Sequence, residues 1–123
     1  MNTVEVMGPG SADKIRANKR MARGWPACWT WVLPKTDPET LDEGDRWQLM
    51  AKWHRERCAV CGMRRPYNLI NDHDHETGLI RGFLCRSCNT LESHGNQIIF
   101  DRYRLVCPAM VFGLKYPYTG WGY

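Results

Sequence analysis

The 123-residue sequence predicts a small α+β domain stapled by a metal ion, and three observations support this fold class. First, two Cys-x-x-Cys pairs occupy segments 58–61 and 85–88, and such knuckles are typical of structural zinc sites. Second, the chain between them reads as a β-hairpin, with strands at 69–73 and 79–84 separated by a Glu-Thr-Gly turn. Third, a helical pattern begins at Arg86. The expected order is knuckle, hairpin, knuckle and helix.

The two knuckles supply four thiolates, which is the full tetrahedral ligand set of a structural zinc ion. Its expected ligands are Cys58, Cys61, Cys85 and Cys88. Gly62 follows the first knuckle and allows the backbone turn that brings amides toward the sulfurs. Because a zinc with four cysteine ligands has no open position, this site is predicted to be structural. The alternative is four cysteines that serve only as core residues.

The composition fits one small domain with arms. Six tryptophans and 43% hydrophobic residues argue against wholesale disorder, and the net charge of +4 is compatible with nucleic-acid binding. No apolar run approaches the roughly 20 residues of a membrane span and no secretory signal is apparent, so we expect a cytoplasmic protein with reduced cysteines. Cys28 and Cys107, outside the knuckles, are expected to be small buried residues; a disulfide between them is the alternative.

The N-terminal part reads as an arm with two distinct segments. A basic helix is expected over residues 11–23, and basic arms commonly reach phosphates. Its candidate DNA-contacting cations are Lys14, Arg16, Lys19, Arg20 and Arg23. The alternative is a solvated helix without a partner. Residues 25–34 combine tryptophans with prolines and predict an extended segment packed onto the domain, with base stacking as the functional alternative.

After a polar loop over residues 35–44, Asp45 can cap a helix over 46–57. The apolar residues of this helix recur with a rough 3.6-residue period, which predicts that they face the core. These residues are Trp47, Leu49, Met50 and Trp53. We therefore expect Trp53 to pack in the core and not to face a ligand.

The region after the hairpin helix is expected to hold one more helix and a tail. The helix is predicted over 96–104, after Gly95. Residues 108–123 mix prolines and glycines with aromatic residues and read as a tail packed on the surface. The predicted division of the chain is an arm over 1–45, a core over 46–104 and a tail over 105–123.

A run of acids and histidines, Asp72-His73-Asp74-His75, lies at the end of the first predicted strand, and Asn89 follows the second knuckle. Side chains alternate along a strand, so the two aspartates are expected on one side and the two histidines on the other. Oxygen and imidazole groups held together suit a hard metal ion and a general base. The alternative is a solvated polar turn without a function.

The segment from Cys58 to Glu92 resembles the recombination endonuclease VII family of bacteriophages, within the HNH or His-Me finger (ββα-metal) nucleases. The resemblance rests on the stretches CAVCG, DHDHETGLIRGFLC and CRSCNTLE. It implies a ββα-metal core and a metal-dependent DNA endonuclease, which in this family acts on branched DNA such as Holliday junctions. It also implies a phage-encoded protein that acts in the bacterial host cell.

The same resemblance assigns roles to individual residues. It implies that the four knuckle cysteines hold the structural zinc. Asp72 and Asn89 would hold the catalytic divalent cation, Mg²⁺ or Mn²⁺, and His73 would be the general base that activates water. His75 matches a further active-site histidine, and Glu92 matches a supporting acid in the following helix.

Cations near the cluster, Arg64, Arg65 and Arg81, are candidate phosphate contacts, with an ordinary surface position as the alternative. The first 45 residues and the tail after Arg104 match no family element. In well-known members, helices outside the core build a dimer, and no corresponding helices are identified in this sequence. A homodimer is a possible assembly. Two other functions stay open: a packaging-associated or homing HNH nicking endonuclease, and a zinc-stapled DNA-binding module without catalysis. The His73 and Asn89 pair argues against the second, because binding alone needs neither.

Overall fold

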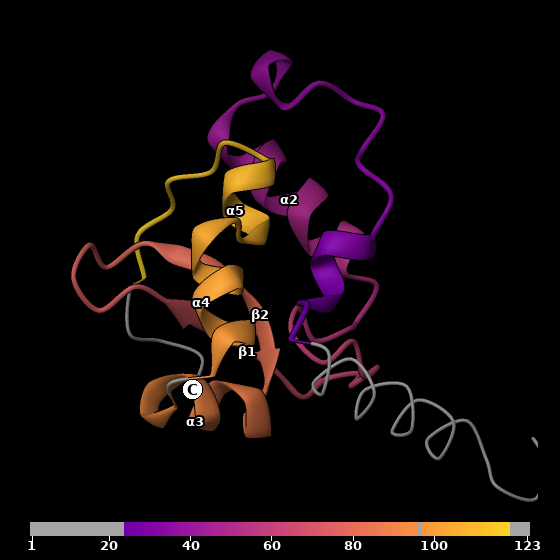
Figure 1. Cartoon of the computed structure of the whole chain (residues 1–123). Helices are drawn as coiled ribbons and strands as arrows, with labels where there is room; N and C mark the ends of the chain where they lie inside the picture. The colour runs from indigo at the N-terminus through magenta and orange to yellow at the C-terminus, as the bar shows by residue number, and fades with distance from the viewer. Residues whose placement is uncertain (1–23, 96, 119–123) are drawn as a thin grey trace, which may run out of the picture.

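The computed structural model describes residues 24–95 and 97–118 and has the predicted α+β fold: a two-stranded hairpin followed by a helix, with further helices packed around it (Figure 1). The predicted basic helix over 11–23, with its five candidate DNA contacts, lies outside the described residues. The elements are the 3-10 helices η1 (Ala27–Thr30) and η2 (Pro38–Thr40), the strands β1 (Leu69–His73) and β2 (Ile80–Cys85), and the helices α2 (Glu43–His54), α3 (Arg86–His94), α4 (Ile98–Leu105) and α5 (Pro108–Val111).

The hairpin confirms the strand prediction almost residue for residue. β1 and β2 pair antiparallel, and the register shifts between Asp72 and His73, where the strand leaves regular pairing. The turn is held by the Asp74 carboxylate, which accepts a hydrogen bond of 2.8 Å from the backbone N–H of Glu76. Gly78 has a φ of 73°, a left-handed conformation that glycine adopts readily. The Asp74 carboxylate therefore stabilises the turn, whereas Asp72, His73 and His75 are the candidate site residues.

The predicted surface position of the C-terminal segment is wrong for residues 108–118, the part of it that the structure describes. Phe112 is fully buried and Leu114 is 5% exposed, so both belong to the core. Farther along, the backbone N–H of Ile80 donates to the carbonyl of Tyr116 at 2.9 Å, and the N–H of Tyr118 donates to Gly78 at 2.7 Å. A two-stranded hairpin is marginal alone. This segment supplies backbone partners beside β2 and apolar cover that the hairpin lacks.

The aromatic N-terminal segment packs onto the first knuckle, as expected, but residues 27–30 form a 3-10 turn instead of an extended strand. The backbone N–H groups of Ala27 and Cys28 donate to the carbonyls of Val60 and Ala59 at 2.8 and 2.9 Å. These bonds tie the chain before α2 to the loop that carries the knuckle cysteines.

Helix α2 begins three residues earlier than predicted, inside the segment expected to be a loop. Asp42, not Asp45, is the N-cap: its carboxylate accepts a hydrogen bond of 2.8 Å from the N–H of Asp45. Both aspartates can cap a helix, and the upstream one does so here. As predicted, Met50 is fully buried, and Trp53 packs edge-on against Phe112 with ring centroids 5.4 Å apart.

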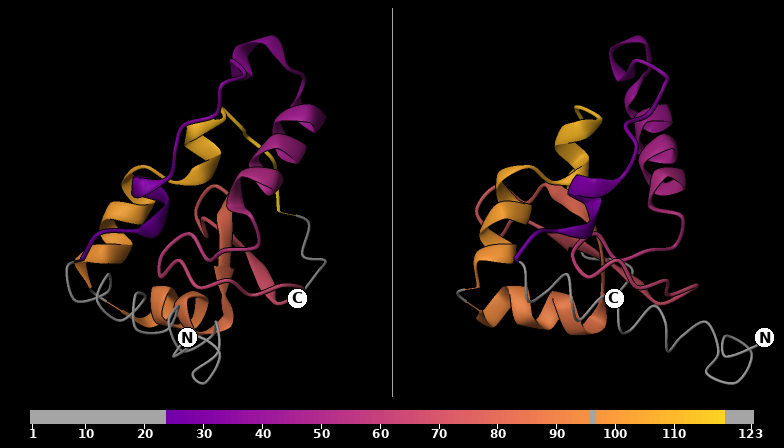
Figure 2. Two further views of the ribbon diagram at one scale, coloured as in Figure 1. Left: turned by 90° about the vertical axis from the view of Figure 1, so that its right-hand side faces the viewer. Right: turned by 45° about the vertical axis from the view of Figure 1, so that its right-hand side comes forward.

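The core lies between the hairpin and helices α2, α4 and α5, seen from three directions in Figures 1 and 2. Its largest fully buried side chains include Phe100, Tyr103 and Phe112. Cys28 and Cys107 are free and buried, as expected for small core residues. Burial, with a smaller effect of Cys107, raises the pKa of the Cys28 thiol to about 12, so this thiol stays neutral. The division into arm, core and tail stays a prediction.

No helix in residues 24–95 and 97–118 is long and apolar enough to cross a lipid bilayer.

His54 is a buried histidine whose two ring nitrogens both have partners. Nδ1 lies 3.0 Å from the carbonyl oxygen of Met50, and Nε2 accepts a hydrogen bond of 3.1 Å from the backbone N–H of Phe83. These contacts require the neutral ring with its proton on Nδ1. Burial lowers the pKa of His54 to about 4, so the folded protein keeps this ring neutral.

We expect the free energy of unfolding to fall as the pH falls from about 6.5 to about 4, because there the unfolded chain binds a proton at His54 that the folded chain does not. The shift corresponds to roughly 3 kcal/mol at most. Urea unfolding across this pH range, with zinc content checked at each step, measures the slope. An NMR titration of the folded protein in which the His54 ring gains its proton near pH 6.5 would contradict the expectation.

Candidate functional site

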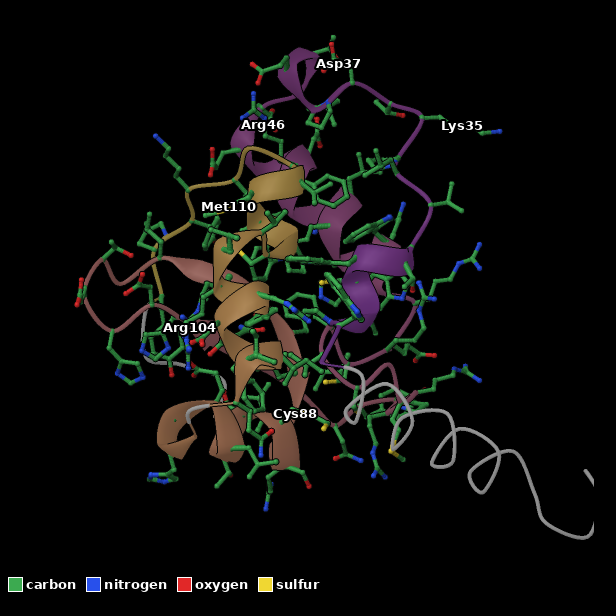
Figure 3. All side chains as sticks on the ribbon, viewed as in Figure 1. Lys35, Asp37, Arg46, Cys88, Arg104 and Met110 are labelled. Carbon is green, nitrogen blue, oxygen red and sulfur yellow. The ribbon has the colours of Figure 1, made fainter. Side chains whose placement is uncertain are left out.

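The knuckle cysteines form one buried cluster at the start of α3. The four sulfurs of Cys58, Cys61, Cys85 and Cys88 all lie within 4.8 Å of one another, and the Cys61 and Cys85 sulfurs are 3.9 Å apart. A tetrahedral site with Zn–S bonds of about 2.3 Å separates its sulfurs by about 3.8 Å. Figure 3 shows the cluster around the labelled Cys88 at the lower end of the molecule. The spacing is compatible with a structural zinc ion.

The backbone around the cluster is arranged as zinc knuckles require. The N–H groups of Met63 and Cys88 point at the sulfurs of Cys61 and Cys85, each at 3.5 Å. Gly62 has a φ of 78°, which explains why glycine follows the first knuckle. Hydrogen bonds from the Cys58 and Cys61 thiols lower the pKa of Cys85, whereas burial raises the pKa of Cys58. A cation would let all four ionise together in this buried place.

Asp72, a predicted metal ligand, is 2% exposed and lies at the centre of a buried polar network. Arg81 donates to it twice, from Nε to Oδ2 at 2.8 Å and from Nη2 to Oδ1 at 3.2 Å. The Tyr103 hydroxyl from α4 donates to Oδ2 at 2.9 Å. Burial raises the pKa of Asp72 to about 6, while the charge of Arg81 opposes that shift. The carboxylate is held rigidly by groups from β2 and α4.

Glu92 extends this network from α3. Its Oε2 lies 3.2 Å from Nη2 of Arg81 and 2.8 Å from Nε of Arg104. The alternating charges of Asp72, Arg81, Glu92 and Arg104 connect the hairpin to α3 and α4. The surface position given as the alternative for Arg81 is therefore wrong, while its contact with a DNA phosphate stays a prediction. Its side chain is only 10% exposed, because two carboxylates pair with it inside the domain.

His73 and His75 lie together at the end of the hairpin, with ring centroids 4.7 Å apart. The His73 ring stacks on Tyr118 at 3.9 Å with nearly parallel planes. Burial, then the neighbouring His75 and Arg81, lowers the pKa of His73, which favours the neutral ring at pH 7. The predicted placing of the aspartates and the histidines on opposite sides of the strand stays a prediction. Tyr118 reaches His73 because the C-terminal segment pairs with the hairpin.

Asn89 lies in the first turns of α3 and is partly exposed, and α3 packs against both strands. A carboxylate and an amide oxygen suit Mg²⁺, which usually keeps several waters and takes few protein ligands. Asp72 Oδ1 accepts one hydrogen bond and retains a second acceptor position. The donor chemistry of Asp72 and Asn89 therefore fits a divalent cation, with Arg81 sharing the carboxylate.

Comparison with known proteins identifies the family. The model of the family described as recombination endonuclease VII matches residues 35–106. The chain belongs to the recombination endonuclease VII family. This match confirms the resemblance seen in residues 58–92. It also includes residues 35–45, in which no family element was expected.

Two phage proteins are similar to part of the chain. The gene 59 protein of Mycobacterium phage L5 is 38% identical over 48 residues, which are 37% of this chain and 29% of that protein. The gene 59 protein of Mycobacterium phage D29 is 46% identical over 37 residues, 27% of this chain and 21% of that protein. The chain thus matches less than a third of the length of either gene 59 protein. No solved structure matches it significantly.

The remaining predicted DNA contacts lie on the loop between the first knuckle and β1. Arg64 is exposed and pairs with Glu56 at 2.7 Å, and Arg65 is exposed beside Met63. Sequence reasoning missed Tyr103 and Tyr118, which touch the two central site residues. Neither tyrosine lies in a sequence motif. The packing of α4 brings Tyr103 to Asp72, and the packing of the C-terminal segment brings Tyr118 to His73.

Proposed function

We propose that this protein is a metal-dependent DNA endonuclease that hydrolyses phosphodiester bonds, with branched DNA as its substrate class. One observation carries the proposal: His73, with a lowered pKa, is fixed by Tyr118 at the hairpin end beside a buried carboxylate and the helix that carries Asn89. Membership of the endonuclease VII family supports nuclease activity. Junction specificity and a homodimer with two sites across a branch are parts of the proposal.

In this proposal His73 is the general base. A base must be neutral to take a proton from the attacking water, and burial together with His75 and Arg81 favours that state. The parallel stacking on Tyr118 restricts the ring to one orientation. His75, exposed at the start of the turn, is placed to contact the phosphate beside His73. A Mg²⁺ or Mn²⁺ ion held by Asp72 and Asn89 would stabilise the charge that develops on the phosphate.

The remaining residues position these groups. Arg81 and Tyr103 hold the Asp72 carboxylate, and Glu92 acts through Arg81, so it is a positioning residue. The four knuckle cysteines, with zinc, would fix the end of β2 to the start of α3. We propose that the protein acts inside a bacterial host cell as a phage-encoded enzyme, as the two mycobacteriophage relatives suggest.

Replacing His73 with alanine is expected to lower the cleavage rate about 10²- to 10⁴-fold, the usual contribution of a general base, while fold and zinc content stay intact. The measurement is a gel assay in magnesium that compares a four-way junction with linear duplex of the same sequence. His94→Ala is the matched control, because His94 is exposed at the far end of α3.

Each outcome of this assay decides between functions. Cutting of the junction alone, lost in His73→Ala, supports a junction-resolving enzyme. Equal cutting of both substrates indicates a general, homing or packaging-associated HNH nuclease. Undiminished cutting by His73→Ala excludes His73 as the base, and binding without any cutting indicates a zinc-stapled DNA-binding module.

A further inference from the structure

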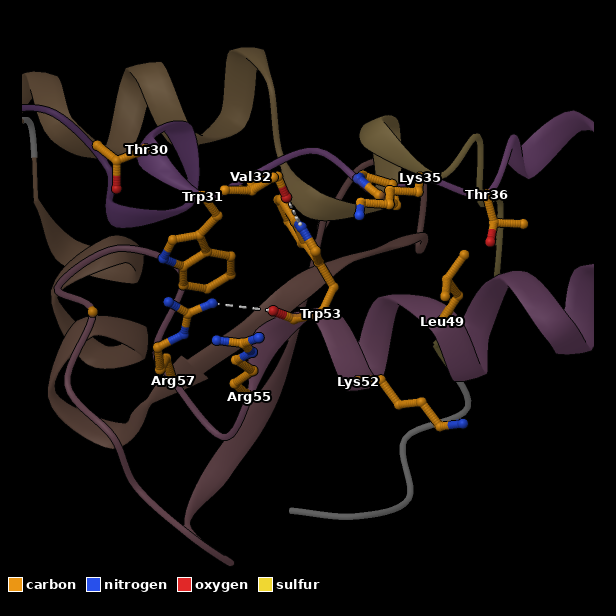
Figure 4. A pocket seen from close by; sticks show the side chains of 12 residues that line it. Thr30, Trp31, Val32, Lys35, Thr36, Leu49, Lys52, Trp53, Arg55 and Arg57 are labelled. Carbon is orange, nitrogen blue, oxygen red and sulfur yellow. Dashed lines mark hydrogen bonds between the residues drawn. The ribbon is translucent and has the colours of Figure 1, made fainter.

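A groove beside α2 gathers positive charge that the proposed active site does not use. Its volume is about 680 Å³, and it lies between α2 and the chain that follows η1 (Figure 4). We call it the α2 groove, and its lining includes Trp31, Lys35, Lys52, Trp53, Arg55 and Arg57. No aspartate or glutamate lines it among residues 24–95 and 97–118. The groove therefore presents four cations around aromatic walls.

Three of these cations have no carboxylate partner among residues 24–95 and 97–118. Lys35, Lys52 and Arg55 are exposed, and none of them takes part in an ion pair with another described residue. The exposed Arg64, by contrast, is paired with Glu56 at 2.7 Å. Among the described residues no carboxylate lines the groove beside these cations, so a bound anion would supply a counter-charge there.

Arg57 is the fixed member of the set. Its guanidinium lies 4.0 Å from the centre of the Trp31 ring and donates to the carbonyl oxygens of His54 at 2.9 Å and Trp53 at 3.2 Å. Figure 4 shows the last of these bonds as the dashed line from Arg57. A guanidinium held in this way keeps its charge in one place, which lowers the entropy cost of binding an anion.

Arg55 is held in the groove wall by an unusual backbone. It is the C-cap of α2 and has a φ of 52°, in the left-handed region where glycine is the common residue. An arginine is less favourable there than glycine, because its Cβ crowds the backbone in the left-handed conformation. The chain thus keeps a cation where a glycine would fold more easily, and this indicates a use for the side chain.

We propose that the α2 groove binds the phosphate backbone of DNA, in an arm of the substrate other than the one cut at His73. This inference rests on the proposed function. In Figure 1 the chain after η1 lies at the right of the domain and the hairpin turn at the left, and the right-hand view of Figure 2 also shows them apart. A branched DNA offers separate arms to two such surfaces, whereas one short linear duplex does not. The groove would then supply preference for branched substrates.

The test measures DNA binding, without cleavage, by fluorescence anisotropy of a labelled four-way junction and a short linear duplex in magnesium-free buffer without chelator, so that the structural zinc is kept. The variant Lys52→Gln with Arg55→Gly is expected to bind the junction roughly tenfold more weakly and to reduce the slope of log K against log salt by about 2. Lys115→Gln, an exposed lysine outside the groove, is the control and should match wild type. Arg55→Gly alone should keep or raise the thermal midpoint, which excludes unfolding as the cause.

The outcomes separate this inference from the proposed nuclease function. Wild-type affinity in the double variant would overturn the groove inference and leave the nuclease untouched, provided wild type cuts in magnesium. Weaker binding in the variant would support the groove even if wild type never cuts. Equal losses for junction and duplex would overturn the assignment to a separate arm. A wild type that binds neither DNA would overturn both.

Discussion

Replacing Cys85 with serine is expected to unfold the central domain and abolish zinc binding. Cys85 ends β2, is the N-cap of α3, and lies 3.9 Å from the Cys61 sulfur in the four-cysteine cluster. Binding of structural zinc contributes about 10–16 kcal/mol in small sites, which exceeds or equals the whole stability of most domains. Serine is a poor zinc ligand beside thiolates, so the loss should remove most of that contribution.

The measurement is zinc content after dialysis together with thermal unfolding by circular dichroism. Cys107→Ser is the matched control, because Cys107 is equally buried but lies outside the cluster. Cys107 is the N-cap of α5, a position that serine suits, so this variant should keep its zinc and most of its stability. Full zinc content and an unchanged midpoint in Cys85→Ser would show that the cluster is not a zinc site.

The parts of the fold that the sequence predicts well are those set by short-range spacing. The knuckles and the hairpin lie within residues 58–88, where each cysteine pair and the turn after Asp74 specify local geometry. The start of α2 is less determined, because Asp42 and Asp45 have the same capping chemistry and only the structure shows which one is used.

The features that the sequence did not predict depend on packing between residues far apart in the chain. The tail prediction fails because prolines and glycines suggest a surface segment, while Phe112 and Leu114 find apolar partners far away in the chain. Tyr103 lies 31 residues from Asp72 in sequence, and no local pattern links the two. The sequence thus predicts the motif residues of the candidate site, but not the hydrogen bonds and ion pairs that connect them.

Arg81 is the clearest case in which long-range packing could not be predicted from the sequence. Replacing it is expected to have the second large effect on stability. Arginine is rarely buried, so a strand arginine beside Gly82 reads as a surface residue. Here Asp72 and Glu92 both pair with its guanidinium inside the domain. Arg81→Met keeps much of the volume but leaves Asp72 with a single described donor, the Tyr103 hydroxyl, while Glu92 keeps Arg104.

Removing one partner of a buried ion pair typically costs about 3–5 kcal/mol, and we expect Arg81→Met to lose that much free energy of unfolding. Urea unfolding at neutral pH, with zinc content confirmed, measures the loss. Arg64→Met is the matched control: its ion pair with Glu56 is as short, at 2.7 Å, but 62% of the Arg64 side chain is exposed. An exposed pair of this kind contributes about 0–1 kcal/mol.

Two further variants identify the cause of the loss. Adding Asp72→Asn to Arg81→Met should restore part of the stability, because the uncompensated charge is removed while the Tyr103 hydroxyl keeps an acceptor. Arg81→Lys should fall between wild type and Arg81→Met, since lysine keeps the charge but cannot donate in the two-pronged manner of Arg81. If Arg81→Met were no less stable than Arg64→Met, the network would not hold the hairpin to α3 and α4. The fixed position of the Asp72 carboxylate would then have to come from other contacts.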